Sequence, residues 1–213
     1  MSELVKTSNG QEAVGLKGGD LLSMVLETKP LALADNDDRV KPIKLLILDV
    51  DGVLTDGGIT YTNTGDESKT FSAKDGLGIV AAQKAGLTVA VITGRKSDIV
   101  RRRMTELGVS HLYMGVGAKA EVLKKLLQKL GLQYKEIAYI GDDLNDLAIM
   151  QVVGLAMAPA DAVLEVQECA HKMLTHAGGH GAVREGIEYI LKKQGRWAQV
   201  LLQYKRERQI KGQ

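Results

Sequence analysis

The sequence predicts an α/β fold, a doubly wound parallel sheet with a projecting β-hairpin flap and no large cap domain. Two observations support this prediction. From residue 43 onward, short apolar runs alternate with helical patterns, and the runs are apolar on both faces, as in strands that helices cover on either side. The alternation is broken once, between residues 57 and 71, by a segment too short to form a second domain.

Residues 1–40 come before the alternation and are expected to form an N-terminal arm or linker. They mix Gly, Asp and Pro with a short apolar stretch at 21–26, and they end in four polar residues at 35–38. The main domain, which contains the alternating apolar runs, is expected to span residues 41–195. Residues 196–213 are expected to form a C-terminal tail.

Five short, mostly apolar runs are expected to be the strands of the sheet. In chain order they are residues 43–50, 89–93, 111–114, 137–141 and 155–158. The clearest helix follows Lys119, because its apolar residues recur at helical spacing while its lysines lie off that stripe, and Gly131 ends it. Strands joined by such helical crossovers form a parallel sheet, which binds ligands at the carboxyl ends of its strands.

The segment that breaks the alternation is expected to be a β-hairpin. Residues 59–62 and 68–71 are short runs typical of strands, and the four residues between them, 63–66, are turn formers. This hairpin would project beside the end of the first strand.

The composition argues against several classes of function. With a net charge of +2 and an aromatic content of 4%, the chain has little positive charge for binding phosphates and few rings for stacking on bases, so nucleic-acid binding is not expected. There is no signal-peptide pattern and no run of about eighteen apolar residues, so no membrane association is expected. The single cysteine, Cys169, cannot form an internal disulfide and fits a reducing compartment. We therefore expect a cytoplasmic protein.

Polar residues follow successive strands of the predicted sheet. They are Asp49 and Asp51, then Thr93, then Lys119, then Asp142 and Asp143. Each alone has an ordinary explanation, such as a strand-ending turn or a helix cap. An EF-hand loop is excluded, because the glycine falls at loop position 4 and position 12 is Thr60. Together they offer what phosphoryl transfer needs: a carboxylate nucleophile, a proton donor, oxygen ligands for Mg²⁺, and hydroxyl and ammonium groups for phosphoryl oxygens.

These motifs resemble those of the haloacid dehalogenase (HAD) superfamily, whose fold is a Rossmann-like α/β sheet. Residues 49–57, 92–96, Lys119 and residues 140–146 are similar to its four motifs in order. Over about residues 43–197, the chain resembles the minimal-cap phosphatases of 3-deoxy-D-manno-octulosonate (KDO) 8-phosphate. The resemblance implies Mg²⁺-dependent hydrolysis of that sugar-acid phosphate, for lipopolysaccharide biosynthesis, by a homotetramer in which a neighbour's hairpin helps to close the site.

The resemblance also implies the roles of individual residues. Asp49 attacks phosphorus to form an aspartyl-phosphate, and Asp51 protonates the leaving oxygen and then deprotonates the hydrolytic water. The carboxylates of Asp49 and Asp142 and the backbone carbonyl of Asp51 hold Mg²⁺. The implied substrate-binding residues are Asp51, Ser72, Ala73, Lys74, Asp75, Gly76, Thr93, Arg95, Arg103 and Lys119.

Two departures from the family pattern keep alternatives open. Val80 and His180 stand where relatives carry arginines, so the substrate could be another sugar-acid phosphate, such as an N-acylneuraminate 9-phosphate. A response-regulator receiver shares the acidic cluster, hydroxyl and lysine, but its phosphate acceptor lies on a later strand than its acidic pair. A catalytically silent phosphate-binding module is disfavoured, because the acidic residues and the lysine are all present.

Overall fold

A computed structural model describes residues 37–210 of the chain. The predicted N-terminal arm lies outside the described residues except for its last four, which form helix α2 (Asp37–Val40). The other helices are α3 (Ala73–Lys84), α4 (Asp98–Glu106), α5 (Lys119–Leu130), α6 (Leu147–Met150), α7 (Leu164–Cys169), α8 (Ala182–Lys193) and α9 (Trp197–Ile210). The strands are β1 (Leu45–Leu48), β2 (Thr60–Tyr61), β3 (Glu67–Ser68), β4 (Thr88–Thr93), β5 (His111–Met114), β6 (Ile137–Ile140), β7 (Leu155–Ala158) and β8 (Lys172–Met173).

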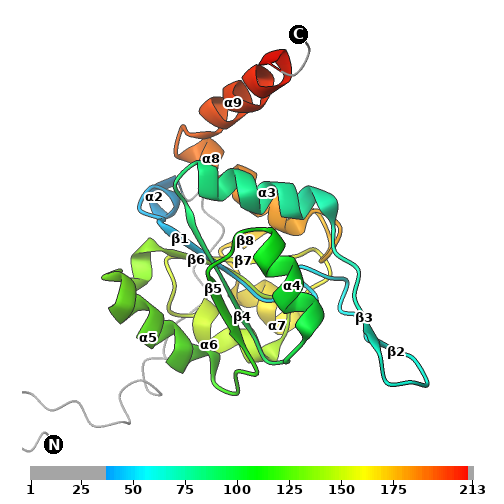
Figure 1. Ribbon diagram of the computed structural model, residues 1–213. Coiled ribbons are helices and arrows are strands. Elements are labelled where there is room, and N and C mark those ends of the chain that lie inside the picture. The colour runs from blue at the N-terminus through cyan, green and yellow to red at the C-terminus, as the bar shows by residue number, and fades with distance from the viewer. Residues whose placement is uncertain (1–36, 211–213) are drawn as a thin grey trace, which may run out of the picture.

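Six strands form one parallel sheet in the order β5-β4-β1-β6-β7-β8 (Figure 1). From β1 the chain builds β4 and β5 on one side and then returns to build β6, β7 and β8 on the other. The carboxyl ends of the central strands therefore meet where the strand order reverses, which is where such sheets bind ligands. The predicted doubly wound fold is confirmed. The edge strand β8 was not predicted, because it is only two residues long.

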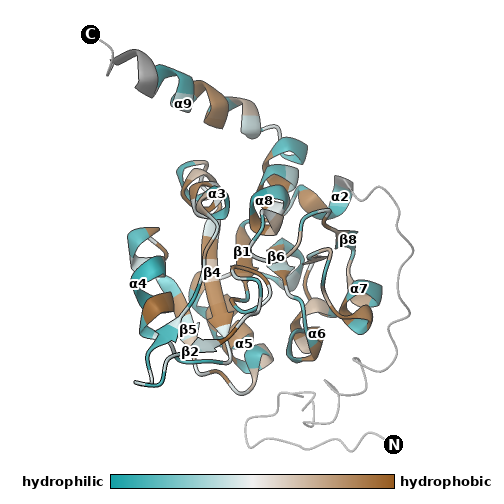
Figure 2. Ribbon diagram, turned by 90° about the vertical axis from the view of Figure 1, so that its right-hand side faces the viewer, coloured by the Kyte–Doolittle hydropathy of each residue, from teal (hydrophilic) through white to brown (hydrophobic). Residues whose placement is uncertain are grey.

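The pleat of β1 divides the core between the two faces of the sheet. Leu46 and Leu48 lie in the apolar cluster that includes residues of α3, α4 and α8, whereas Leu45 and Ile47 lie in the cluster that includes α5, α6 and α7. Helices cover both sides of the sheet in Figure 2. Because successive side chains of a strand point to opposite faces, all four residues are buried, and this run is apolar throughout.

Strand β1 is shorter than the predicted strand at 43–50. The chain leaves the sheet after Leu48, and the Val50 carbonyl then accepts hydrogen bonds from the N–H groups of Val53, Leu54 and Thr55. This tight turn places the polar residues that follow β1 at the mouth of the sheet.

The predicted hairpin is present, with shorter strands than expected. Strands β2 and β3 pair antiparallel, and the hairpin projects from the body of the domain in Figure 1. The expected second strand at 68–71 instead ends at Ser68, because Lys69 turns toward Asp51 and Phe71 packs against the core. Within the described chain no other element stands between β1 and α3, so there is no large cap.

Helix α9 projects from the domain in Figures 1 and 2. Its first residue, Trp197, packs under the Arg184 guanidinium of α8, at 5.2 Å from the ring centre. Leu201 and Leu202 are exposed further along. The helix occupies most of the predicted C-terminal tail, and the domain boundary at residue 195 stays a prediction. Among residues 37–210, no helix is long and apolar enough to cross a membrane.

Candidate active site

The polar residues that follow three neighbouring strands meet at one edge of the sheet. Asp49 follows β1, Thr93 ends β4, and Asp142 lies just beyond β6. Strand β1 pairs with both β4 and β6, so these three strand ends are adjacent. Lys119, the first residue of α5, brings its ammonium group to the same place. The structure thus gathers the polar residues that the sequence placed at successive strand ends.

Lys119 is buried between two carboxylates. Its Nζ lies 3.0 Å from Asp49 Oδ1 and 2.6 Å from Asp146 Oδ1. Burial acts to lower the pKa of Lys119, but the two carboxylates outweigh burial and the pKa is raised. An ammonium group that stays charged beside Asp49 is suited to binding phosphoryl oxygens.

Asp146 holds this arrangement in place, and both of its oxygens are occupied. Oδ1 accepts hydrogen bonds from Lys119 Nζ and from the Tyr139 hydroxyl (2.5 Å). Oδ2 accepts from the N–H groups of Asp142 (2.9 Å) and Asp143 (3.5 Å). We therefore interpret Asp146 as the support of Lys119 and of the loop after β6. Tyr139 was not predicted from the sequence. It could have been found because it is a tyrosine in an otherwise apolar, buried strand, where its hydroxyl group needs a hydrogen-bond partner.

Asp49 and Asp142 form an acidic pair suited to a divalent cation. With Asp146, they offer carboxylate oxygens that lie within 4.8 Å of one another. Asp142 Oδ1 is buried and has no hydrogen-bond partner among the described residues. Burial and the neighbouring carboxylates raise the pKa of Asp49 to about 6 and that of Asp142 to about 8. This concentrated negative charge on oxygen ligands fits Mg²⁺, which prefers such ligands.

Replacing Asp142 with asparagine is expected to stabilise the metal-free protein at alkaline pH. The pKa of the Asp142 carboxyl rises from 3.8 to about 8, so the folded protein keeps a proton that the unfolded chain loses. The folded state binds more protons across this window, and its stability therefore falls as the pH rises from about 4 to about 8. We expect Asp142→Asn to gain about 1 to 3 kcal/mol at pH 8, after allowance for partial exposure, and almost nothing at pH 4.

Urea unfolding in the presence of a chelator measures this gain at the two pH values. Saturating Mg²⁺ should reverse the order of stabilities at pH 8, because only the parent protein keeps the carboxylate ligand. A gain of equal size at both pH values would show that the Asp142 carboxylate is not under electrostatic strain.

Gly52 makes room for Asp142. Its φ is +85°, and a Cβ at this position would lie 1.9 Å from Asp142 Oδ2, so a side chain here would displace the carboxylate. Gly178 packs behind it, because a Cβ there would lie 1.9 Å from the Gly52 carbonyl oxygen. The Gly178 N–H donates to Asp161 Oδ1 (2.9 Å). The glycine-rich segment 178–181 therefore supports the loop after β1.

Asp51 lies at the mouth of the site between two cations. Arg95 Nε is 3.8 Å from Asp51 Oδ2, and the Lys69 ammonium group contacts Oδ1. Glu67 Oε1 lies 3.6 Å from both cations. Arg95 also donates a hydrogen bond to the Tyr61 hydroxyl of the hairpin (2.6 Å). Sequence reasoning predicted Arg95 but missed Lys69 and Glu67, because a short polar hairpin gives no signal of which side chains point inward.

The segment predicted to bind substrate, residues 72–76, forms the start of α3. Ser72 accepts a hydrogen bond from the Asp75 N–H (3.3 Å) and so caps the helix. Ala73 and Lys74 are exposed in the first turn. Their contacts with a substrate stay predictions.

Asp75 and Gly76 are buried and join α3 to other helices. The Asp75 carboxylate accepts hydrogen bonds from the N–H groups of Gly181 (3.1 Å) and Arg184 (2.7 Å) at the start of α8. A Cβ on Gly76 would lie 2.3 Å from Arg103 Nη2, so the glycine lets this α4 side chain lie across α3. Arg103 is thus placed beside the predicted substrate segment.

The two positions that depart from the family pattern lie near this segment. Val80 on α3 packs against the core. His180 Nδ1 donates a hydrogen bond to the Gly178 carbonyl (2.8 Å), so the imidazole is engaged in the turn before α8.

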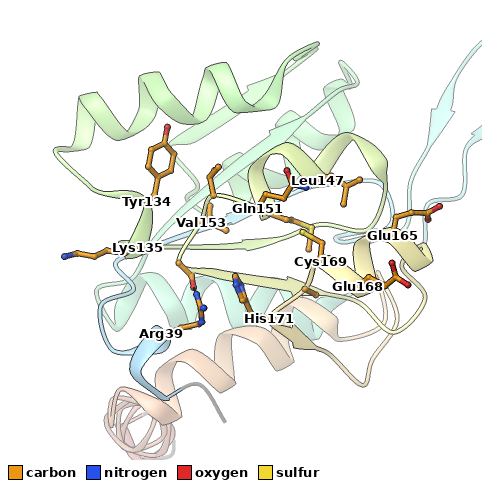
Figure 3. A pocket seen from close by; sticks show the side chains of 14 residues that line it. Arg39, Tyr134, Lys135, Leu147, Gln151, Val153, Glu165, Glu168, Cys169 and His171 are labelled. Carbon is orange, nitrogen blue, oxygen red and sulfur yellow. Dashed lines mark hydrogen bonds between the residues drawn. The ribbon is translucent and has the colours of Figure 1, made fainter. Parts of the chain in front are cut away.

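A hollow with a volume of about 630 Å³ lies between α6 and α7 (Figure 3). Arg39, Tyr134 and Lys135 lie at one end of it, and Glu165 and Glu168 at the other. None of the predicted site residues lines this hollow, so it is separate from the acidic centre.

Comparisons with known proteins relate the chain to hydrolases. Residues 112–185 match the model of the haloacid dehalogenase-like hydrolase family. The chain is 45% identical over 163 residues to the 3-deoxy-D-manno-octulosonate 8-phosphate phosphatase KdsC of Escherichia coli strain K12, in an alignment that covers 76% of this chain and 87% of that protein.

Two solved structures are similar along most of the chain. The 3-deoxy-D-manno-octulosonate 8-phosphate phosphatase of Moraxella catarrhalis, in complex with magnesium, phosphate and KDO, is 40% identical with a TM-score of 0.77, over 79% of this chain and 97% of that one. The cobalt-bound deoxy-D-mannose-octulosonate 8-phosphate phosphatase of Haemophilus influenzae is 39% identical with a TM-score of 0.74, over 77% of this chain and 99% of that one.

Proposed function

This chain belongs to the haloacid dehalogenase-like hydrolases, and we propose that it hydrolyses KDO 8-phosphate to KDO and inorganic phosphate. It is a phosphoric monoester hydrolase. The observation that carries the proposal is an acidic, oxygen-lined centre with Lys69 and Arg95 beside Asp51 at its mouth. The centre suits a phosphoryl group with Mg²⁺, and the mouth suits a second anionic group on the substrate.

Mg²⁺ fits the ligands at the centre. The Asp49 and Asp142 carboxylates and the Asp51 backbone carbonyl would hold it, with phosphate and water completing the coordination. The unpartnered Asp142 Oδ1 supports this assignment, as does the magnesium ion in the relative from Moraxella catarrhalis. When bound, the ion supplies positive charge that offsets the repulsion between the Asp49 carboxylate and the phosphate.

Asp49 is the nucleophile of the first half of the reaction. One of its carboxylate oxygens forms a bond to phosphorus while the bond from phosphorus to the sugar oxygen breaks. The Asp51 carboxyl group gives its proton to that sugar oxygen, so the sugar leaves as a neutral alcohol. Lys119, 3.0 Å from Asp49, and Thr93 at the end of β4 bind the phosphoryl oxygens.

Asp51 then acts as the base of the second half. Its carboxylate takes a proton from a water molecule, and the water oxygen attacks phosphorus as the bond from phosphorus to the Asp49 oxygen breaks. Inorganic phosphate leaves, Asp49 returns to a carboxylate, and Asp51 has regained the proton that it gave to the sugar.

The predicted substrate-binding cations account for the choice of a sugar acid: Arg95 lies at the mouth, and Arg103 lies beside the predicted substrate segment. Lys74, Arg95 and Arg103 are more cations than one phosphate needs beside Mg²⁺ and Lys119. KDO carries a carboxylate in addition to its phosphate ester. A charge-assisted hydrogen bond from an arginine to that carboxylate is stronger than one to a neutral hydroxyl.

KDO 8-phosphate is therefore expected to have a higher kcat/KM than a neutral hexose phosphate such as glucose 6-phosphate. A lost hydrogen bond to a charged group typically costs about 1.5 to 3 kcal/mol, which corresponds to roughly a 10- to 150-fold difference. Steady-state kinetics with Mg²⁺ on both substrates, and on an N-acylneuraminate 9-phosphate, measure the preference. Equal kcat/KM values for the acid and neutral sugars would overturn the sugar-acid assignment.

We place the reaction in the cytoplasm, as a step of lipopolysaccharide biosynthesis carried out by a homotetramer. The hairpin is too small to enclose a substrate, and its tip projects from the domain. A neighbouring subunit's hairpin would supply the missing wall and exclude water from the reacting phosphate. Light scattering of the active species tests this arrangement, which predicts an oligomer rather than a fully active monomer.

A further inference from the structure

The hairpin brings a buried lysine to the mouth of the active site. Lys69 follows β3, and its side chain is only 1% exposed although the hairpin tip projects from the domain. The ammonium group contacts Asp51 Oδ1 and lies 3.6 Å from Glu67 Oε1. Burying an ammonium group is costly unless it is paired, so the position of Lys69 depends on these carboxylates.

The Asp51 carboxylate is held on its other side by Arg95, whose Nε lies 3.8 Å from Oδ2. Glu67 braces both cations, and its Oε2 accepts a hydrogen bond from the Ser97 hydroxyl (2.7 Å) at the start of α4. The carboxylate therefore accepts a hydrogen bond from the hairpin cation Lys69 at one oxygen, and Arg95, from the loop after β4, lies only at ion-pair distance from the other.

We propose that Lys69 is a positioning residue that orients the Asp51 carboxyl group for proton transfer. The inference rests on the proposed function, in which Asp51 gives a proton to the leaving sugar oxygen and later takes one from water. Proton transfer requires the two heavy atoms to come within hydrogen-bond reach, and a displacement of about 1 Å can cost roughly 100-fold in rate. Lys69 acts through Asp51 and needs no contact with the phosphate.

A role as a simple anchor for the hairpin explains Lys69 less well. Phe71, two residues later, already packs against the core. Glu67, two residues earlier, is tied to Ser97. The base of the hairpin thus has an apolar and a hydrogen-bonded attachment without Lys69. A buried ammonium group needs a charged partner, and of its two carboxylate neighbours Asp51 is the nearer.

The leaving group of the substrate distinguishes the two roles. A sugar phosphate expels an alkoxide and needs a proton from Asp51, whereas p-nitrophenyl phosphate expels a stable phenolate and does not. The parameter kcat/KM reports the steps through departure of the leaving group. We expect Lys69→Met to lower kcat/KM for KDO 8-phosphate by about 10- to 100-fold, and that for p-nitrophenyl phosphate by less than about 3-fold.

Three further variants control the experiment. Lys41→Met removes an exposed lysine that pairs with Asp38, and it should leave both substrates unaffected. Lys69→Arg keeps the charge and should restore most of the loss. The double variant Lys69→Met with Asp51→Asn should be within about 2-fold of Asp51→Asn alone, because residues that act as one unit are not additive. Thermal unfolding monitored by circular dichroism reports whether each variant is folded.

The proposal is overturned if Lys69→Met lowers kcat/KM equally for both substrates, or if its loss adds in full to that of Asp51→Asn. If Lys69→Met does not fold, Lys69→Arg provides the test. The proposal is then overturned if Lys69→Arg is folded but its kcat/KM for KDO 8-phosphate stays far below that of the parent protein. If the parent protein does not hydrolyse KDO 8-phosphate, the proposed substrate is wrong. The role of Lys69 can then still be tested by comparing the loss of kcat/KM in Lys69→Met for glucose 6-phosphate with the loss for p-nitrophenyl phosphate.

Discussion

The Asp49→Asn variant is expected to lose turnover by a factor on the order of 10⁴ or more while keeping its fold. The amide has the volume of the carboxylate but is a poor nucleophile and a weaker metal ligand. Asp49 is buried, and its carboxylate repels Asp146, so removing the charge relieves an unfavourable contact. Release of inorganic phosphate from KDO 8-phosphate and from p-nitrophenyl phosphate measures the loss.

An exposed aspartate provides the matched control for this variant. The Asp38 side chain is 97% exposed and lies away from the site, so Asp38→Asn should retain full activity. In the absence of metal, the midpoint temperature of thermal unfolding should be at least as high for Asp49→Asn as for the parent protein. Turnover by Asp49→Asn within 10-fold of the parent would rule out Asp49 as the nucleophile.

Removing Mg²⁺ is expected to abolish hydrolysis, and restoring it should return full activity. The acidic centre holds Asp49, Asp142 and Asp146 together with a single lysine. Without the ion, a phosphate dianion would meet uncompensated carboxylates. The measurement is phosphate release after dialysis against a chelator, followed by titration with Mg²⁺.

The two neighbouring aspartates should respond differently to metal titration. We expect Asp142→Asn to weaken Mg²⁺ binding by more than about 100-fold, since the loss of residues that merely support a ligand already costs roughly 10- to 100-fold. Asp51→Asn should bind Mg²⁺ almost normally, because it contributes its backbone carbonyl, yet turn over slowly. Equal losses of Mg²⁺ affinity in the two variants, measured by calorimetry, would show that the Asp51 side chain is the ligand.

The sequence predicts the central sheet well because burial on two faces leaves a direct mark. Strand β1 is apolar at every position, and the helix after Lys119 shows its stripe and its terminal Gly131, which adopts the left-handed conformation that ends the helix. Parallel topology then brings Asp49, Thr93 and Asp142 to one edge, so the centre of the site follows from strand order alone.

The rim of the site could not be predicted in the same way, because it depends on contacts between distant segments. Asp75 was predicted to bind substrate because of its place in a motif. Its carboxylate accepts a hydrogen bond from the N–H of Gly181, which lies 106 positions away in the chain. Lys69 has no motif at all, and it reaches Asp51 only because β3 ends one residue before it. Neither fact has a periodicity or a spacing that could reveal it.

The covalent step on Asp49 can be observed directly in the Asp51→Asn variant. With p-nitrophenyl phosphate the first half of the reaction needs no proton from residue 51, whereas hydrolysis of the aspartyl-phosphate does need its base. Acid quenching followed by peptide mass spectrometry should then find one phosphoryl group on Asp49, in amount equal to the burst of p-nitrophenolate. A full burst with no phosphoryl group on the protein, or with the group on another residue, would contradict the account.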